Sequence, residues 1–287
     1  MTPTSTYRLH PDLSLGAAEL TVSDLGRSVA FYEQVLGMTV LERGDGTARL
    51  GTATRPLLRL TEVPGAAPAP RSAPGLYHFA VLLPTRADLA RWVWHAAGLG
   101  LRLGQGDHLV SEAFYLNDPD GHGIEVYRDR PRQEWRWNLD QVEMASDPID
   151  IAGLLAEPGA DTPFAGLPEG TVMGHFHLRV TDLAATEAFY RGVLGFDVVA
   201  RWPGALFVSV GGYHHHLGLN AWQSEGGRPA PETTARLLGV ELTLPGAAEV
   251  ERLAAHLEAA GVPFTRNGSG LTVRDPAGNR LSFGTTA

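Results

Sequence analysis

The chain has 287 residues, about twice the length of an ordinary domain of roughly 100–150 residues, which predicts two domains or one large one. It has no cysteine, which excludes a disulfide framework, a thiolate nucleophile and an iron–sulfur site, so any metal must be held by histidine and carboxylate side chains. Lys and Arg number 23 against 32 Asp and Glu, and the net charge of −9 excludes nucleic acid as an expected partner.

The sequence also predicts no membrane partner. No uninterrupted apolar stretch approaches the roughly 18 residues of a membrane span. Met1 to Leu15 lacks the basic start and apolar run of a secretory signal. We therefore expect a cytoplasmic protein.

The first predicted elements form a unit that recurs later in the chain. Residues 18–37 read AELTVSDLGRSVAFYEQVLG, and residues 175–195 read HFHLRVTDLAATEAFYRGVLG at an offset of 158 residues. Alternating apolar residues before Asp24 and Asp182 predict a strand, and each Asp predicts a helix N-cap. The glycines that follow, Gly37 and Gly195, predict left-handed helix ends. Short strands are expected next, at 39–42, 48–50 and 57–61 and at 197–201, 206–210 and 215–220.

A second pair of units follows the same order. LYHFAVLLP at 76–84 is similar to LLGVELTLP at 237–245, and helices are expected at 86–98 and 247–261. DPDGHGIEVY and DPAGNRLSFG then predict hairpins that join the last two strands of each unit. The chain is therefore expected to hold four βαβββ units in two domains, residues 10–130 and 171–287, joined by a connection at 131–170.

Four such units, with the pattern D-L-x(5)-F-Y-x(3)-L-G after the first strand, resemble the vicinal oxygen chelate superfamily. The longer segments GLYHFAVLLPTRADLA, GDHLVSEAFYLNDPDGHGIEVYRDRP, GHFHLRV and ALFVSVGGYHHHLGLNAW are similar to the two-domain bacterial catechol 2,3-dioxygenases. The resemblance implies an α+β fold in which pairs of units form cup-shaped mixed sheets. It also implies a divalent metal on the first and last strands of the units, held in the dioxygenase branch by two His and one Glu.

The resemblance assigns the ligand positions residue by residue. His78 and Glu125 fall at ligand positions in the second unit, and His175 falls at one in the third. His177 points the same way as His175, but the register favours His175. The corresponding positions of units one and four hold Ala17, Gly239 and Ser282.

Two interpretations of this split remain open. Either the site is degenerate and the protein binds small molecules without metal, or units two and three share one cup. We favour the second interpretation, because random loss is not expected to leave one complete His, His, Glu set across adjacent units. Units one and four would then form a metal-free cup. Two imidazoles and a carboxylate suit Fe(II), and Mn(II) accepts the same set.

The resemblance also implies catalytic residues near the metal. Tyr115 lies where the family places a substrate-contacting tyrosine, and His108 resembles a further family histidine that guards the substrate hydroxyl. His214, His215 and His216 begin the predicted last strand of unit three, where the family carries an acid/base histidine. Strand alternation puts His214 and His216 on one face, and we expect His216 to enter the cup.

The sequence therefore predicts an Fe(II)-dependent extradiol dioxygenase that uses O₂ to cleave catechol or a substituted catechol. One alternative is a glyoxalase-type isomerase, which normally needs four protein ligands. The other is a metal-free, antibiotic-sequestering binding protein. The expected partners are a small aromatic diol and O₂, and a homo-oligomer is expected by analogy.

Overall fold

The computed structural model describes residues 7–285. Residues 1–6 of the N-terminal segment and residues 286–287 of the predicted second domain lie outside the described part. The first half contains β1 (Ser14–Val22), α1 (Leu25–Leu36), β2 (Thr39–Gly44), β3 (Thr47–Gly51) and β4 (Pro56–Glu62) as module one. Module two consists of β6 (Gly75–Leu82), α2 (Arg86–Gly98), β7 (Gly104–Asp107), β8 (Ser111–Asn117) and β9 (Gly123–Asp129).

The second half repeats this order. Module three consists of β12 (Val172–Arg179), α4 (Leu183–Glu187), β13 (Asp197–Trp202), β14 (Ala205–Ser209) and β15 (Leu217–Asn220). Module four consists of β17 (Leu237–Leu244), α5 (Ala247–Ala259), β18 (Phe264–Asn267), β19 (Gly270–Arg274) and β20 (Arg280–Thr285). The connection holds a 3₁₀ turn (Arg132–Glu134), β10 (Trp137–Asn138), β11 (Gln141–Val142) and α3 (Ile151–Leu155). Two short strands outside the modules, β5 (Ala67–Pro68) and β16 (Thr234–Ala235), pair with each other.

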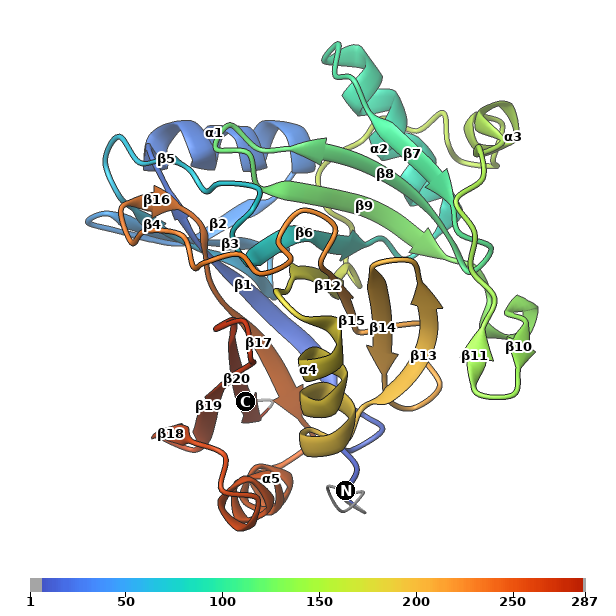
Figure 1. The fold of residues 1–287 in the computed structure, drawn as a ribbon. Helices are drawn as coiled ribbons and strands as arrows, with labels where there is room; N and C mark the ends of the chain where they lie inside the picture. Colours follow the sequence, from blue (N-terminus) through green and yellow to red (C-terminus); the bar gives the residue numbers. More distant parts are fainter. Residues whose placement is uncertain (1–6, 286–287) are drawn as a thin grey trace.

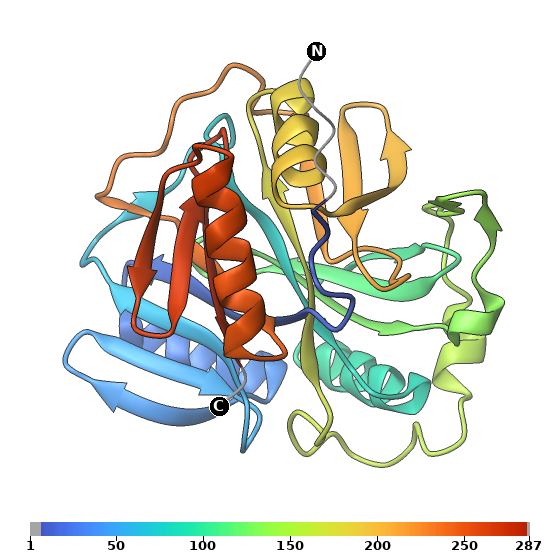
Figure 2. The same ribbon diagram turned by 90° about the horizontal axis from the view of Figure 1, so that it is seen from below.

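Each large sheet takes one module from each half of the chain (Figure 1). The order β18-β19-β20-β17-β1-β4-β3-β2 joins modules four and one, and the order β13-β14-β15-β12-β6-β9-β8-β7 joins modules three and two. The central antiparallel pairs are β1 with β17 and β6 with β12. Figure 2 shows the two curled sheets from below, with helices on their outer sides. The predicted fold class, including the shared sheet of units two and three, is confirmed.

The predicted helix ends are also confirmed. Asp24 accepts a hydrogen bond from the Arg27 amide at 2.8 Å, and Asp182 accepts one from the Ala185 amide at 3.0 Å. Gly37 ends α1 in the left-handed region with φ of 68°. The helix of module three differs from that of module one, because α4 continues into a π-helical turn at Ala188–Val193. Such turns insert one residue into the helical repeat.

The repeated tyrosines join modules that belong to different sheets. Tyr32 on α1 donates to Asp118, in the turn before β9, at 2.8 Å. Tyr190 donates to Asp275, in the equivalent turn of module four, at 3.0 Å. Both rings are completely buried. Each half is thus linked internally by a tyrosine–aspartate bond, while the sheets link the two halves.

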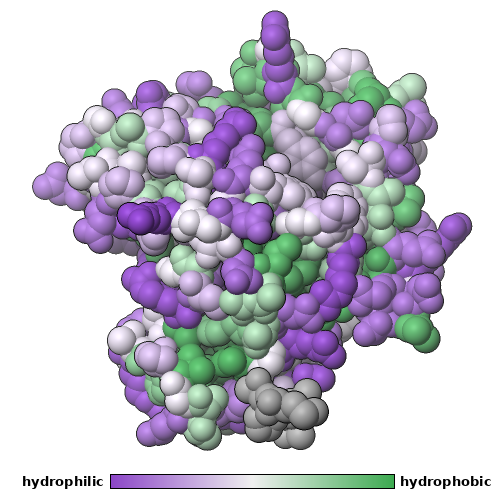
Figure 3. All heavy atoms as spheres, viewed as in Figure 1, coloured by the Kyte–Doolittle hydropathy of each residue, from purple (hydrophilic) through white to green (hydrophobic). Residues whose placement is uncertain are grey.

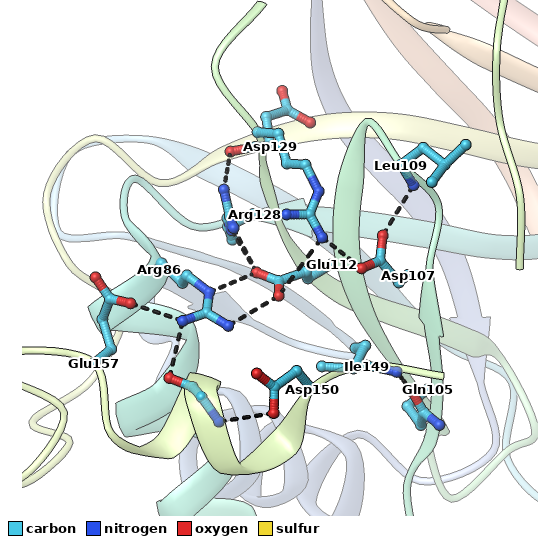
Figure 4. Close-up of polar contacts among 12 residues, drawn as sticks. Arg86, Gln105, Asp107, Leu109, Glu112, Arg128, Asp129, Ile149, Asp150 and Glu157 are labelled. Carbon is cyan, nitrogen blue, oxygen red and sulfur yellow. Dashed lines mark hydrogen bonds and ion pairs between the residues drawn. The ribbon is translucent and has the colours of Figure 1, made fainter. Parts of the chain in front are cut away.

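An ion network around the buried Glu112 fastens the central connection to the outer side of the second sheet (Figure 4). Glu112 on β8 accepts from Arg86 at 2.9 Å and from Arg128 on β9 at 2.7 Å. Arg86 also donates to the Gly153 carbonyl of α3 at 2.9 Å and to Glu157 at 2.7 Å. The network therefore holds α2, α3 and two strands together.

None of the helices in residues 7–285 is long and apolar enough to cross a membrane.

Candidate metal centre and cavity

Three side chains from adjacent strands converge on the concave face of the second sheet. On β12, His175 and His177 share one face because alternate residues of a strand point the same way. His177 lies opposite His78 on the antiparallel neighbour β6, and Glu125 lies beside Ala80 on the parallel neighbour β9. The opposite faces of these strands carry Phe79 and Phe176, which are fully buried in the core.

The distances within this triad suit a shared metal ion. His78 Nε2 lies 3.0 Å and His175 Nε2 lies 3.1 Å from the same oxygen of Glu125, and the two nitrogens are 3.3 Å apart. Ligand atoms about 2.1 Å from a metal are separated by about 3.0 Å at adjacent corners of an octahedron. All three side chains are buried, and they form the only group of three potential ligands among residues 7–285. The donor set therefore fits Fe(II) or Mn(II) and has three members rather than four.

The electrostatics of the triad favour ligand-competent protonation states. Burial alone raises the pKa of Glu125, but the two imidazoles outweigh burial and hold its pKa well below the ordinary range. Burial lowers the pKa of His78, so the imidazole is neutral at neutral pH. Glu125 Oε1 and His175 Nδ1 are buried without a hydrogen-bond partner in the described chain. An anionic carboxylate and a neutral imidazole are the forms that bind a metal.

In the first sheet, other side chains occupy the positions that are equivalent to those of the triad. A Cβ added to Gly239 would lie 2.6 Å from the Arg280 guanidinium, so this side chain occupies the place that a ligand would need. Arg280 is paired with Glu19, and Arg59 is paired with Glu241 at 3.0 Å. Among the described residues, modules one and four thus contribute ion pairs and no metal-binding group.

Tyr115 and His108 lie together beside the triad. Tyr115 on β8 is directly opposite Glu125, as the predicted hairpin requires. Its hydroxyl is 2.6 Å from His108 Nε2, and His108 Nδ1 is 2.7 Å from the Ala145 carbonyl. Because Nδ1 must donate to that carbonyl, Nε2 accepts from the tyrosine. Burial, then the negative charge of Glu125, raises the pKa of Tyr115 well above its ordinary value, so the phenol keeps its proton.

The predicted orientation of the histidine triplet is wrong. The three histidines precede β15 in an irregular turn, so strand alternation does not apply to them. His215 lines the cavity, and its ring centroid is 4.3 Å from that of His175. His216 is held away from the cavity by Ser209 at 2.9 Å, and His214 bonds to Asp129 at 2.8 Å. Neither His216 nor His214 lines the cavity.

The triad opens into a cavity of about 750 Å³. One wall consists of Tyr77, His177 and Trp222, whose ring centroids are 5.0 to 5.5 Å apart. The register of β6 against β12 shifts at Tyr77, and this bulge leaves Tyr77 among the cavity-lining residues together with its neighbour His78. Sequence alternation alone places these two neighbours on opposite faces, so the aromatic wall was missed.

A curled sheet made of two βαβββ modules, with two imidazoles and a carboxylate in its hollow, defines a protein of the vicinal oxygen chelate type with a candidate metal centre. The chain belongs to the Glyoxalase/Bleomycin resistance protein/Dioxygenase superfamily, whose family model matches residues 14–126 and 172–283.

Individual relatives agree with this assignment. A protein of Bacillus subtilis (strain 168) described as "Catechol-2,3-dioxygenase" is 44% identical over 285 residues, which is 96% of this chain and 98% of the relative. The crystal structure of a putative dioxygenase from Bacillus subtilis is similar in fold, with a TM-score of 0.67, 12% identity and coverage of 98% and 87% of the two chains. Glyoxalase I from Zea mays shares the fold with a TM-score of 0.56 at 17% identity, over 95% of this chain and 92% of its own.

Proposed function

We propose that this protein is an extradiol dioxygenase that cleaves the ring of catechol or a substituted catechol and incorporates both atoms of O₂. The observation that carries the proposal is the convergence of His78, His175 and Glu125 in the lining of a cavity large enough for an aromatic substrate. The relative described as a catechol-2,3-dioxygenase, which aligns over 96% of the chain, supports the same reaction.

In this proposal the triad holds Fe(II), with Mn(II) as a possible substitute. The bound metal would bind both catechol oxygens and O₂, and it would supply a route for electron transfer from the catechol to O₂. The protein's own contribution is a buried site: each of the three ligand residues is at most 7% exposed. Exclusion of water strengthens the electrostatic interactions within such a site.

We assign the acid/base role to His215 in place of His216. Burial, then the neighbouring His175, lowers the pKa of His215 well below its ordinary value, so the imidazole is unprotonated at neutral pH. A neutral imidazole that lines the cavity beside a ligand residue is placed to accept a proton from a substrate hydroxyl. The Tyr115 hydroxyl donates its proton to His108. We assign the Tyr115 oxygen to form a hydrogen bond with the second substrate hydroxyl.

Reconstitution tests the proposal. The purified chain is stripped of metal, loaded anaerobically with Fe(II) or Mn(II), mixed with catechol and then exposed to air. We expect yellow ring-fission product and uptake of about one O₂ per catechol. Absence of product with catechol, simple alkylcatechols and carboxylate-bearing catechols, in protein that holds the metal, would overturn the proposal.

The ligand assignment needs its own variant. Glu125→Gln removes the carboxylate and is expected to weaken metal binding by about 10- to 100-fold or more, because the anionic ligand is lost. The matched control is Glu241→Gln, which removes a carboxylate from the sheet of modules one and four and is expected to keep the metal. Equal metal content in the two variants, measured by elemental analysis after dialysis, would contradict the assignment.

A further inference from the structure

The cavity is rich in arginine although the chain as a whole is acidic. The net charge is −9, yet the cavity is lined by two carboxylates and by five arginines, Arg71, Arg179, Arg236, Arg274 and Arg280. Neither carboxylate pairs with these arginines. Glu125 belongs to the triad, and Asp120 accepts hydrogen bonds from Arg27 and Ser23. The charge of the cavity is therefore cationic, which favours entry of an anion.

Arg179 is the arginine on the same strand as the candidate ligand His175. It follows His175 and His177 at two-residue spacing on β12, so the three side chains share the face that lines the cavity. Arg179 forms no ion pair with a described carboxylate, and its Nε is buried without a hydrogen-bond partner in residues 7–285. A guanidinium left unpaired in a partly buried place is costly, and a bound anion would remove that cost.

A second arginine faces the same place. Besides burial, the strongest influence on Arg179 is the positive charge of Arg71, and both act in the direction that lowers the pKa of Arg179. Arg71 is exposed at the cavity and has no described carboxylate partner either. Two like charges directed at one cavity repel each other, and an anion between them turns that repulsion into two attractions.

The other cavity arginines differ in how many partners their side chains already have. Arg280 is paired with Glu19, and Arg274 donates to the Gly278 carbonyl at 2.9 Å. Arg236 has only the fully exposed Glu232 at 3.7 Å, and its Nε is also buried without a partner. Hydrophilic side chains gather on the face of the molecule over β5, β16 and the loop between β15 and β16 (Figure 3).

We propose that Arg179 and Arg71 form a carboxylate-binding subsite, so that the substrate is a catechol whose ring carries an anionic substituent. The inference rests on the proposed function, because the two hydroxyls would lie at the triad. Four residues of strand, about 13 Å, separate Arg179 from His175. A ring placed along the wall of Tyr77, His177 and Trp222, with its substituent directed toward a long arginine side chain, spans that interval.

Binding to the metal-free protein tests the subsite separately from ring cleavage. The probes are a catechol with a carboxylate para to one hydroxyl, and its methyl ester, which has the same ring without the charge. Affinity is measured by quenching of tryptophan fluorescence, since Trp222 is in the cavity wall. We expect the acid to bind about tenfold or more tightly than the ester, as charge-assisted hydrogen bonds predict. Added salt is expected to weaken binding of the acid only.

Variants identify the residues responsible. Arg179→Gln is expected to reduce the preference for the acid to about twofold or less, while Arg179→Lys keeps part of it. Arg71→Gln, at an exposed position, serves as the second test should Arg179→Gln fail to fold. The matched control is Arg102→Gln, an exposed arginine outside the cavity, which is expected to keep the full preference.

The outcomes separate the two proposals. Equal affinity of the wild-type protein for acid and ester, or an unchanged preference in both Arg179→Gln and Arg71→Gln, overturns the subsite. If the iron-loaded protein then still cleaves catechol, the proposed function stands without it. A preference for the acid that depends on Arg179, in an iron-loaded protein that cleaves neither catechol nor the acid, supports the anion subsite and overturns the proposed reaction.

Discussion

His215 is the last member of a short line of hydrogen-bonding groups that begins at Asp129. Asp129 lies 2.8 Å from His214 Nε2, and His214 Nδ1 lies 2.8 Å from His215 Nδ1. The carboxylate requires a proton on His214 Nε2, which leaves His214 Nδ1 as an acceptor for the His215 Nδ1–H. Nε2 of His215 is then the unprotonated nitrogen, the form that a general base needs. In the proposed mechanism, His214 and Asp129 are therefore positioning residues that act through His215.

The first prediction compares two neighbouring histidines. His215→Gln is expected to lower kcat by about 100-fold or more, the range for loss of a general acid/base, with unchanged metal content. His216→Gln is expected to change kcat by less than about threefold, because His216 bonds to Ser209 and lies outside the cavity. Steady-state rates with metal-loaded protein check both values. A larger loss in His216→Gln than in His215→Gln would contradict the assignment.

The sequence predicts the triad because its members lie on regular strands. The resemblance to the vicinal oxygen chelate superfamily assigned His78, His175 and Glu125 as ligands, and the constant offset between repeats carried the ligand positions from one unit to the next. The histidine triplet could not be oriented in this way, because it lies in a turn whose path depends on the strands around it. Tyr77 was missed for a related reason, since its bulge exists only where β6 pairs with β12. The proximity of Arg71 to Arg179 likewise depends on how a linker lies against another module.

At the scale of elements, Glu112 connects parts of the chain that are distant in sequence. It is 2% exposed, and it binds Arg86 at the start of α2 and Arg128 on β9 (Figure 4). Arg86 carries the link onward to α3. Removal of the shared carboxylate would leave Arg128 partly buried without a counter-charge, and would leave Arg86 with Glu157 as its remaining carboxylate partner among the described residues. Such uncompensated charges are more costly than the intact pair is favourable.

The second prediction concerns this network and its pH dependence. Glu112→Gln is expected to lower the free energy of unfolding by about 3 kcal/mol at neutral pH. Burial raises the pKa of Glu112, but its arginine partners outweigh burial, and the net pKa lies below the ordinary value of 4.5. The stabilisation is therefore complete above pH 4.5 and is lost as the pH falls through the lowered pKa of the folded state. Wild type and variant should converge in acid.

Urea unfolding at a series of pH values measures this difference. The control is Glu251→Gln, which removes an ion pair with Arg266 on the open surface and is expected to have no measurable effect. A difference between wild type and Glu112→Gln that stays constant from neutral pH to about pH 3 would contradict the ionic origin of the stabilisation.

At the scale of the whole molecule, every module is bound to two others by different means. Sheet pairing joins module one to four and module two to three, while the bonds from Tyr32 to Asp118 and from Tyr190 to Asp275 join one to two and three to four. The candidate ligands come from both halves, because His78 and Glu125 precede the connection and His175 follows it. Residues 10–130 and 171–287 stay predicted as domains, but neither contains a complete triad.

The third prediction follows from this arrangement. A protease site introduced at the exposed Asp161–Thr162 bond would separate the halves covalently while leaving the β6–β12 pair intact. We expect the cleaved protein to stay together, to hold one equivalent of metal and to keep its activity. The two fragments are then separated in denaturant and refolded alone. Neither is expected to bind metal at concentrations where the whole chain does, because each fragment lacks part of the triad and half of the strands of each sheet. Mixing the two fragments should restore binding. Metal binding by one isolated fragment, with the affinity of the whole chain, would show that the centre does not depend on both halves.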